Sequence, residues 1–303
     1  MTRIWLPDSP QTFGGPYAGL EADVWKGGEF PPSADEVEFA VTPPGFNNPE
    51  ITRKLVTLPR LTTIQILSAG ADYILPLIPA HITLCNARGA HTPATAEWTA
   101  GAIIASIRNF PRFLAGQQAG HWDPAVSDTV AGKRVLIVGY GSIGEAVERR
   151  LAGWEVTIDR VARRARDGVH AIGELPGLLP SADVVVILVP ATEETRGLVD
   201  AQFLKTMKDG ALLVNAARGK IVDTDALLDE LTAGRLRAAL DVTDPEPLPD
   251  GHPLWSAPGL LLSPHVGGNV RGFRARAYQV VKEQLGRLAA GQPLLNVVGP
   301  EGY

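Results

Sequence analysis

The sequence predicts an α/β fold in which helices cover parallel β-sheets, and three features of the 303-residue chain indicate it. Short apolar runs alternate with amphipathic segments along most of the chain, as they do in βαβ units. A glycine-rich turn stands between an apolar run and a helical segment near the middle. The chain is also long enough for two domains that each bury a core. We therefore expect two α/β domains.

The first third of the chain is predicted to form a small unit with a parallel sheet. Its apolar runs are residues 4–6, 37–41, 64–67 and 82–85, and Pro and Gly separate them. Thr92 and Pro93 then resemble a helix N-cap followed by proline at the first helical position. They predict a helix over residues 94–108 that is apolar on much of its surface and therefore buried.

The alternation of strands and helices resumes after a loop-rich stretch over residues 110–131. Asp223 is expected to cap the helix that ends near Leu231. A long last helix is predicted over 270–290, and the proline-rich loop 244–253 is long enough to suggest a functional role. The predicted strands are residues 134–138, 155–159, 184–189, 211–215, 236–241 and 259–263.

The glycine-rich turn is the most informative motif. Gly139 permits a tight turn, Gly141 leaves room for a pyrophosphate, and Gly144 allows close packing of helix on strand. The amides of Ser142 and Ile143 open the helix and would face the phosphates. The motif predicts a dinucleotide-binding site, and the alternative is an ordinary strand–helix turn.

Composition excludes several other classes of function. The net charge is −5 and no basic block stands out, so nothing supports a nucleic-acid partner. The only cysteine, Cys85, lies in an apolar run and is expected to be a buried strand residue rather than a nucleophile. No signal peptide, membrane span or metal site is expected, so the cytoplasm is the default location.

Three residues that suit carbonyl chemistry each follow a predicted strand of the second half. His265 is a candidate proton donor, because histidine titrates near neutrality. Glu246 would orient the imidazole and favour its protonated form. Arg218 is suited to bind a substrate carboxylate and polarise the adjacent carbonyl. Parallel sheets bind ligands at the edge formed by the carboxyl ends of their strands, where all three residues are expected. Together, the three side chains predict interconversion of a ketone and an alcohol.

Each of these residues also has an ordinary structural interpretation. Arg218 could cap a helix or pair with a surface carboxylate. Glu246 is one of several acids in an acidic loop, and His265 could be a core histidine with its hydrogen bonds satisfied. The functional hypothesis rests on the three residues occurring together with the glycine motif.

Several segments, in the same order, resemble those of the D-isomer-specific 2-hydroxyacid dehydrogenases. The loop Asp241-Val-Thr-Asp-Pro-Glu-Pro-Leu-Pro is most similar to the glyoxylate/hydroxypyruvate reductase branch. The other segments are Ser68-Ala-Gly-Ala-Asp72, Thr95-Ala-Glu-Trp98, the glycine motif from Gly132 to Gly144, Val214-Asn-Ala-Ala-Arg-Gly219 and Ser263-Pro-His-Val-Gly267.

The resemblance implies two Rossmann/flavodoxin-like domains with parallel sheets. The dinucleotide-binding domain, residues 93–269, would be inserted into a discontinuous substrate domain of residues 1–92 and 270–303. The family also implies a homodimer formed through the long helix and loop of the insert.

The same resemblance implies a role for particular residues. Arg218 would bind the substrate, His265 would be the acid/base, and Glu246 would be its partner. Backbone amides near Ala69 and Gly70 would hold the substrate carboxylate, and Asp241 would contact the nicotinamide carboxamide. The remaining implied cofactor contacts are Pro190, Ala217 and Gly267.

One departure from the family pattern bears on the cofactor. NAD-specific members carry an acidic residue at the end of the second strand of the cofactor domain. Alignment on Gly153 and Val156 puts Arg160 in this place, although Asp159 is only one position away. An arginine there, supported by Arg163 or Arg164, would suit a 2′-phosphate, so we expect NADP to be preferred over NAD.

The sequence thus predicts an oxidoreductase that reduces a small 2-oxo acid to its D-2-hydroxy acid with NAD(P)H. An alternative within the family is oxidation of a phosphite-type anion, which can use the same three residues. Formate oxidation is disfavoured, because those members carry glutamine in place of Glu246. A second alternative is a non-catalytic regulator that senses the dinucleotide.

Overall fold

The computed structural model describes residues 1–299, which form two compact units. One unit comprises Met1–His91 and the chain from Arg271 onward, and the other comprises Thr92–Val270. Each contains one sheet whose strands all pair in parallel, so the predicted α/β class is confirmed. The division into a substrate domain and a dinucleotide-binding domain stays a prediction at this point.

The first unit holds a five-stranded sheet between helices. Alternate residues of a strand face opposite sides, so Trp5 packs in the core with Leu55 of α1 (Pro49–Leu55). Its neighbour Ile4 packs with Val281 of α8 (Phe273–Ala289) on the other face. In order across the sheet, the strands are β2 (Leu20–Val24), β1 (Thr2–Leu6), β3 (Val37–Val41), β4 (Thr63–Gln65) and β5 (Thr83–Cys85).

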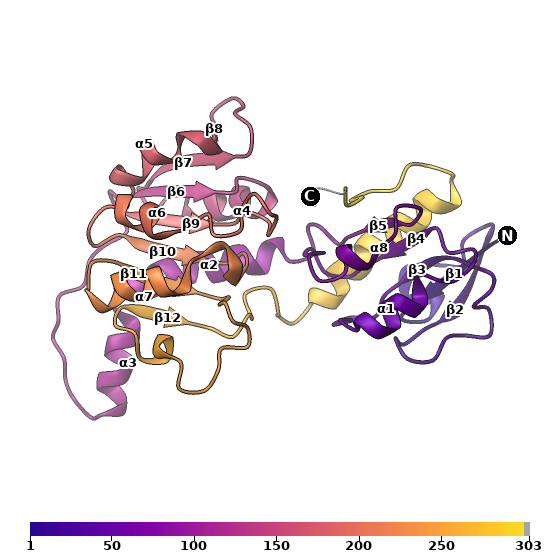
Figure 1. The fold of residues 1–303 in the computed structure, drawn as a ribbon, viewed down its shortest axis with the longest axis horizontal. Coiled ribbons are helices and arrows are strands. Elements are labelled where there is room, and N and C mark those ends of the chain that lie inside the picture. Colours follow the sequence, from indigo (N-terminus) through magenta and orange to yellow (C-terminus); the bar gives the residue numbers. More distant parts are fainter. Residues whose placement is uncertain (300–303) are drawn as a thin grey trace. The chain divides into compact units, whose positions relative to one another are not determined.

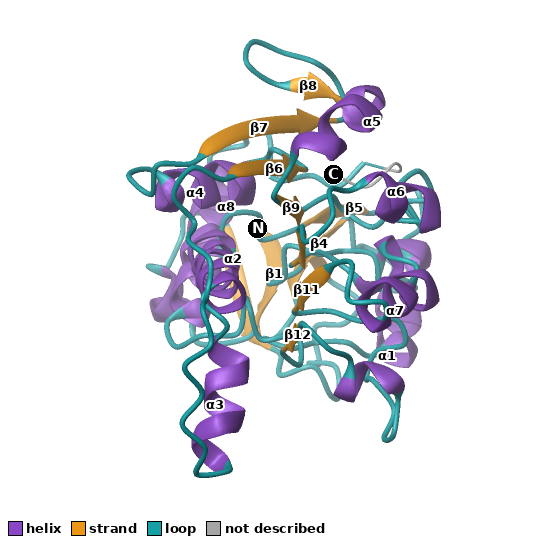
Figure 2. Ribbon diagram, turned by 90° about the vertical axis from the view of Figure 1, so that its left-hand side faces the viewer, coloured by secondary structure: helices purple, strands orange, loops and turns teal. Residues whose placement is uncertain are grey.

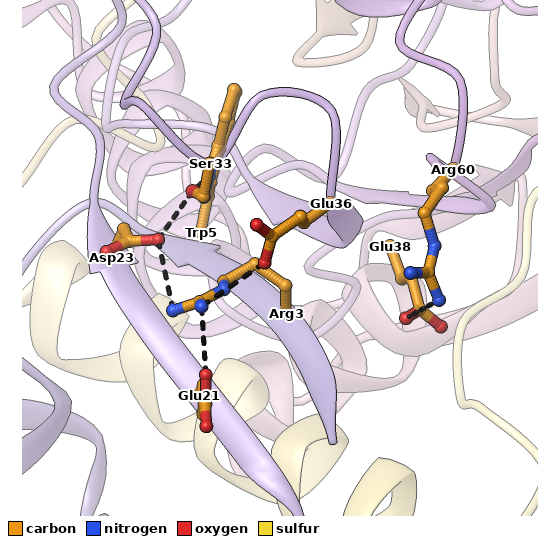
Figure 3. Close-up of polar contacts among 8 residues, drawn as sticks. All are labelled: Arg3, Trp5, Glu21, Asp23, Ser33, Glu36, Glu38 and Arg60. Atoms are coloured by element: carbon orange, nitrogen blue, oxygen red, sulfur yellow. Dashed lines mark hydrogen bonds and ion pairs between the residues drawn. The ribbon is translucent and has the colours of Figure 1, made fainter.

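Charged and polar contacts attach the edge strand β2 to its neighbour. The Arg3 guanidinium lies 2.9 Å from Glu21 and 3.7 Å from Asp23, as Figure 3 shows. The Ser33 hydroxyl donates to Asp23 at 2.5 Å and accepts from the indole nitrogen of Trp5 at 2.9 Å. These side chains cover the β2 edge of the sheet. The residues of β2 are partly buried or exposed, so no apolar run marks this strand in the sequence.

The second unit is built on a seven-stranded sheet, drawn from β8 at the top to β12 at the bottom of its ribbon in Figure 1. The chain builds outward from β6 in both directions, so β6 and β9 meet at the switch point where α/β sheets bind ligands. In order across the sheet, the strands are β12 (Leu260–Leu262), β11 (Arg237–Leu240), β10 (Leu212–Asn215), β9 (Val184–Ile187), β6 (Arg134–Val138), β7 (Thr157–Ala162) and β8 (His170–Ala171).

Helices cover both faces of this sheet. On one face, α2 (Thr92–Ile107) and α4 (Ser142–Leu151) pack against residues such as Val135 and Ile137 of β6. The alternate residues of β6, such as Leu136, point to the opposite face of the sheet. There they pack in a core with α6 (Ala201–Thr206) and α7 (Thr224–Thr232). A short helix, α5 (Leu175–Leu178), joins the second face. The predicted burial of the helix after Pro93 is confirmed, since Ile103 is fully buried.

Three sequence predictions of element bounds are wrong. The stretch predicted as loop contains a helix, α3 (Phe110–Gln118), which extends away from the sheet of its unit in Figure 2. None of its residues is buried, and Phe110 and Leu114 are exposed, so it lacks a buried stripe that a helical pattern would reveal. The second strand of the cofactor half begins two residues late and runs through Ala162, because Gly153 and Glu155 form the preceding turn at positive φ. The last helix begins at Phe273 rather than at 270.

Candidate active site

His265 and Glu246 are hydrogen-bonded to each other on two neighbouring loops of the second unit. His265 follows β12 and Glu246 follows β11, and Nδ1 lies 2.5 Å from Oε1. An ionised carboxylate can only accept, so Nδ1 carries the shared hydrogen and Nε2 is left for another partner. Both side chains are about half exposed, and a pocket of about 450 Å³ lies beside them. The pair can therefore meet a small molecule.

The segment that carries His265 is held by the buried carboxylate of Asp241. One carboxylate oxygen accepts from the Ser263 hydroxyl at 2.6 Å and from the Val266 amide at 2.9 Å. The other accepts from the Gly267 amide at 2.8 Å. The main-chain oxygen of Asp241 accepts from the His265 amide at 2.7 Å. Four hydrogen bonds thus fix the backbone on both sides of the histidine.

This support matters because His265 adopts a φ of 53°, in the left-handed region. A side chain other than glycine costs about 1–3 kcal/mol there and persists only where its surroundings enforce it. The three donors to its carboxylate take up most of the acceptor capacity of Asp241. In the structure, Asp241 anchors the loop that carries His265. Contact of Asp241 with a nicotinamide carboxamide stays a prediction.

Arg218 lies on the loop after β10, the strand next to β11. Asn215 orders this loop by donating to the Arg218 carbonyl at 2.9 Å and accepting from the Ala217 amide at 3.0 Å. A Cβ on Gly219 would lie 1.9 Å from the carbonyl oxygen of Thr243, so only glycine permits this approach. The Arg218 loop is therefore pressed against the backbone that leads to Glu246.

Ala69 and Gly70 belong to the other unit, in the segment that follows β4. Their carbonyl oxygens each accept from a side chain at 2.8 Å, Ala69 from Asn86 and Gly70 from Ser68. These bonds order the backbone, as a preformed anion site requires. Their role in holding a carboxylate stays a prediction.

The glycine-rich turn connects β6 to α4. Gly139 has a φ of 103°, and a Cβ there would lie 2.5 Å from the backbone of Leu188 and Val189. A Cβ on Gly141 would meet nothing within 4 Å, so open space lies beside the turn. Ser142 and Ile143 open α4, and its cap, Gly141, makes no side-chain bond to their amides. This is the arrangement that receives an anion at a helix start.

A pocket of about 250 Å³ lies beside this turn. It is lined largely by residues at and after the ends of β6, β7 and β9, including Gly139, Gly141 and Pro190. Ala162 and Arg163 form its wall on the β7 side, and Glu194 forms its wall on the β9 side. The position and lining suit the adenosine portion of a dinucleotide.

Comparison with known families identifies the chain. Residues 100–267, more than half of its length, match the family model described as D-isomer specific 2-hydroxyacid dehydrogenase, NAD binding domain. The chain belongs to this family. The resemblance predicted from its motifs is confirmed, and the protein is an NAD(P)-dependent oxidoreductase.

Curated relatives and solved structures of 2-hydroxyacid dehydrogenases cover most of the chain. A glyoxylate reductase of Thermofilum pendens is 33% identical over 249 residues, which are 77% of this chain and 74% of that one. A glyoxylate/hydroxypyruvate reductase A of Enterobacter is 31% identical over 232 residues, 72% and 74% of the two chains. The crystal structure of a family member from Xanthobacter autotrophicus in complex with NADPH and MES superposes with a TM-score of 0.81, 29% identity and coverage of 99% and 98%.

The prediction that Arg160 stands at the end of the second strand of the cofactor half is wrong. Arg160 lies inside β7, where it is paired with Ile137 of β6, and the strand ends at Ala162. The residue at the strand end that lines the pocket is therefore Ala162, followed by Arg163. The alignment failed because β7 begins at Thr157 and continues beyond Arg160 to Ala162. Asp159 is also occupied elsewhere, by Arg134 at 2.8 Å.

Arg160 instead supports the glycine turn from behind. Its Nε donates to the Glu148 carboxylate of α4 at 2.7 Å, and this contact holds the pKa of Glu148 below its ordinary value. Glu148 also accepts from the hydroxyl of Tyr140, the residue between the first two glycines. Arg166 donates to the Tyr140 carbonyl at 2.6 Å, and Arg160 and Arg166 both lie over its ring.

Sequence reasoning missed this cluster of Tyr140, Glu148, Arg160 and Arg166. The only sequence signal of this cluster was Tyr140, the aromatic residue inside the glycine motif. Arg166 bonds to Tyr140 across 26 residues, and contacts between such distant residues leave no local sequence pattern. Sequence reasoning also missed Trp255, which lines the pocket beside His265 from a short 3-10 helix, Pro253–Ser256, at the end of the proline-rich loop. In the part of the chain that the structure describes, no helix is long and apolar enough to cross a lipid bilayer.

Substitution of Arg160 tests its new assignment. We expect Arg160→Ala to weaken NADP⁺ and NAD⁺ binding together, by about two- to tenfold, because the turn that both share loses a hydrogen-bonded support. Calorimetric titration measures both dissociation constants, and Arg149→Ala removes the same charge from an exposed position of α4 as a control. Loss of NADP⁺ affinity alone would show that Arg160 contacts the 2′-phosphate after all.

Proposed function

We propose that this dehydrogenase reduces a small 2-oxo acid, of the glyoxylate or hydroxypyruvate type, to its D-2-hydroxy acid, with NADPH as the preferred cofactor. The observation that carries the proposal is the 2.5 Å bond between His265 and Glu246 on loops next to that of Arg218. A proton donor, its carboxylate partner and a guanidinium are the groups that such a reduction needs. Relatives named glyoxylate reductase and glyoxylate/hydroxypyruvate reductase support this substrate class.

Each residue has one task in the proposed reaction. When bound, the reduced dinucleotide supplies a hydride to the carbonyl carbon. His265 donates the proton from Nε2 to the carbonyl oxygen, so that one hydride and one proton convert the ketone to an alcohol. Glu246 keeps the imidazole in the tautomer and orientation that this donation requires. Arg218 binds the substrate carboxylate and polarises the carbonyl, and we propose that amides near Ala69 and Gly70 also bind the carboxylate.

Two observations support the preference for NADPH. The strand end that lines the adenosine pocket carries Ala162 in place of an acidic residue, and Arg163 follows it at the wall. A guanidinium there suits a 2′-phosphate, and a relative 29% identical to this chain was crystallised with NADPH. Tighter binding of NAD⁺ than of NADP⁺ by the wild type would contradict this preference.

We also propose that the protein is a homodimer formed through α3 and the segment after it. Large apolar side chains are exposed there, with Leu114 58%, Trp122 89% and Val126 95% accessible. Such a patch is unusual for a surface that faces only water. Sedimentation equilibrium should give twice the 32.2 kDa of one chain, and a monomer would contradict the proposal.

Turnover by a histidine variant tests the proposed reaction. Wild type should oxidise NADPH in the presence of glyoxylate or hydroxypyruvate, and His265→Ala should lower kcat by about 10²–10⁴-fold because the proton donor is lost. NADP⁺ affinity should change less than about twofold, since the imidazole acts on the substrate carbonyl. The matched control is His170→Ala, which removes another histidine bonded to a glutamate, at 2.8 Å from Glu174.

Two outcomes would contradict the proposal. A His265→Ala variant that keeps more than about a tenth of the wild-type rate would show that this residue is not the acid. Wild type that binds NADP⁺ tightly without turning over any 2-oxo acid would favour a sensing role over catalysis.

A further inference from the structure

We propose that Glu194 closes the adenosine end of the cofactor pocket through an ion pair with Arg163, and that a 2′-phosphate must displace it. Glu194 is then a specificity-determining residue that limits the preference for NADPH. The inference rests on the proposed use of NADPH, and it concerns a residue that neither the sequence motifs nor the proposed mechanism uses.

The ion pair connects two walls of one pocket. Arg163 follows β7 and Glu194 belongs to the loop after β9, and both line the 250 Å³ pocket beside the glycine turn. The Arg163 Nε lies 3.6 Å from Glu194 Oε2. The two side chains are 43% and 74% exposed, so both ends of the pair can move. The carboxylate thus sits beside the cation that a 2′-phosphate would need.

The backbone under Glu194 is fixed although its side chain is exposed. The Thr195 hydroxyl donates to the Pro190 carbonyl at 2.5 Å and accepts from the Thr192 amide at 2.9 Å. The Gly197 amide donates to the Lys220 carbonyl at 3.0 Å and ties the far end of the turn to the next loop. The loop therefore presents Glu194 at a constant place on the rim of the pocket.

The charges give the pair a different effect on each cofactor. A 2′-phosphate brings negative charge to Arg163 and competes with the Glu194 carboxylate for the same donors. Binding of NADP⁺ must therefore break the ion pair, whereas the unphosphorylated ribose of NAD⁺ leaves it in place. Exposed pairs contribute about 0.2–1 kcal/mol, which corresponds to about a 1.4- to fivefold change in a dissociation constant.

Isothermal titration with NADP⁺ and NAD⁺ tests the proposal without any substrate. Glu194→Gln keeps the shape of the side chain and removes its charge, so we expect NADP⁺ to bind about 1.4- to fivefold more tightly and NAD⁺ to bind as in the wild type. The gain should shrink in high salt, because exposed charges are screened. Glu193→Gln is the matched control: it removes the neighbouring charge, which pairs with Arg196 at 3.7 Å.

A double variant separates competition for Arg163 from simple repulsion. If the ion pair is the cause, Glu194→Gln should give no gain in NADP⁺ affinity when Arg163→Gln is already present. An equal gain in that background would overturn the proposal, as would no gain in Glu194→Gln alone or the same gain in Glu193→Gln. Weaker NAD⁺ binding by Glu194→Gln would also overturn it, because the carboxylate would then bind the ribose. The proposed preference for NADPH is judged separately, from the wild-type ratio of the two dissociation constants.

Discussion

The carboxylate of Asp241 accepts three hydrogen bonds from the segment that carries His265, and its main-chain oxygen accepts a fourth. These bonds hold the histidine at a φ of 53°, which an unsupported loop would relax. The imidazole must lie within reach of Glu246 for its tautomer to be set. The proposed proton transfer from His265 therefore depends on the buried Asp241 carboxylate, which need not touch the substrate.

The parallel sheet explains why these groups can meet. Strands β10, β11 and β12 are neighbours, so the loops that follow them carry Arg218, Glu246 and His265 along one edge. The Arg218 loop can approach the next loop only because Gly219 has no side chain. The same edge continues to the switch point between β6 and β9, where the glycine turn and its pocket lie. The proposed substrate chemistry and the proposed cofactor site thus share one sheet edge.

Much of this arrangement could be predicted from the sequence, because it depends on local patterns. The apolar runs of β6 and β9 to β12 mark strands, and the positions after β10, β11 and β12 identified Arg218, Glu246 and His265. Whether those three residues act in catalysis remains for experiment. The helix α3 could not be predicted, since its exposed apolar residues give no buried stripe.

Arg160 shows where such patterns fail. Its assignment to the ribose depended on the number of residues between the glycine turn and the strand end, and no periodicity determines that number. Because β7 continues to Ala162, Arg160 lies inside the strand, where it donates to Glu148 and its guanidinium lies over the Tyr140 ring. Two residues at the pocket wall, Arg163 and Glu194, follow β7 and β9, which flank β6 in the sheet, and the sequence alone does not give this strand order.

The rate of reduction by Asp241→Asn tests the central claim most directly. An amide has only one acceptor oxygen, so its NH₂ group would face at least one of the Val266 and Gly267 amides, and two donors would oppose each other. We expect kcat with glyoxylate and NADPH to fall at least about tenfold while the protein stays folded, because His265 is no longer held for proton transfer. A variant that retains the wild-type kcat would contradict the claim that Asp241 positions the histidine.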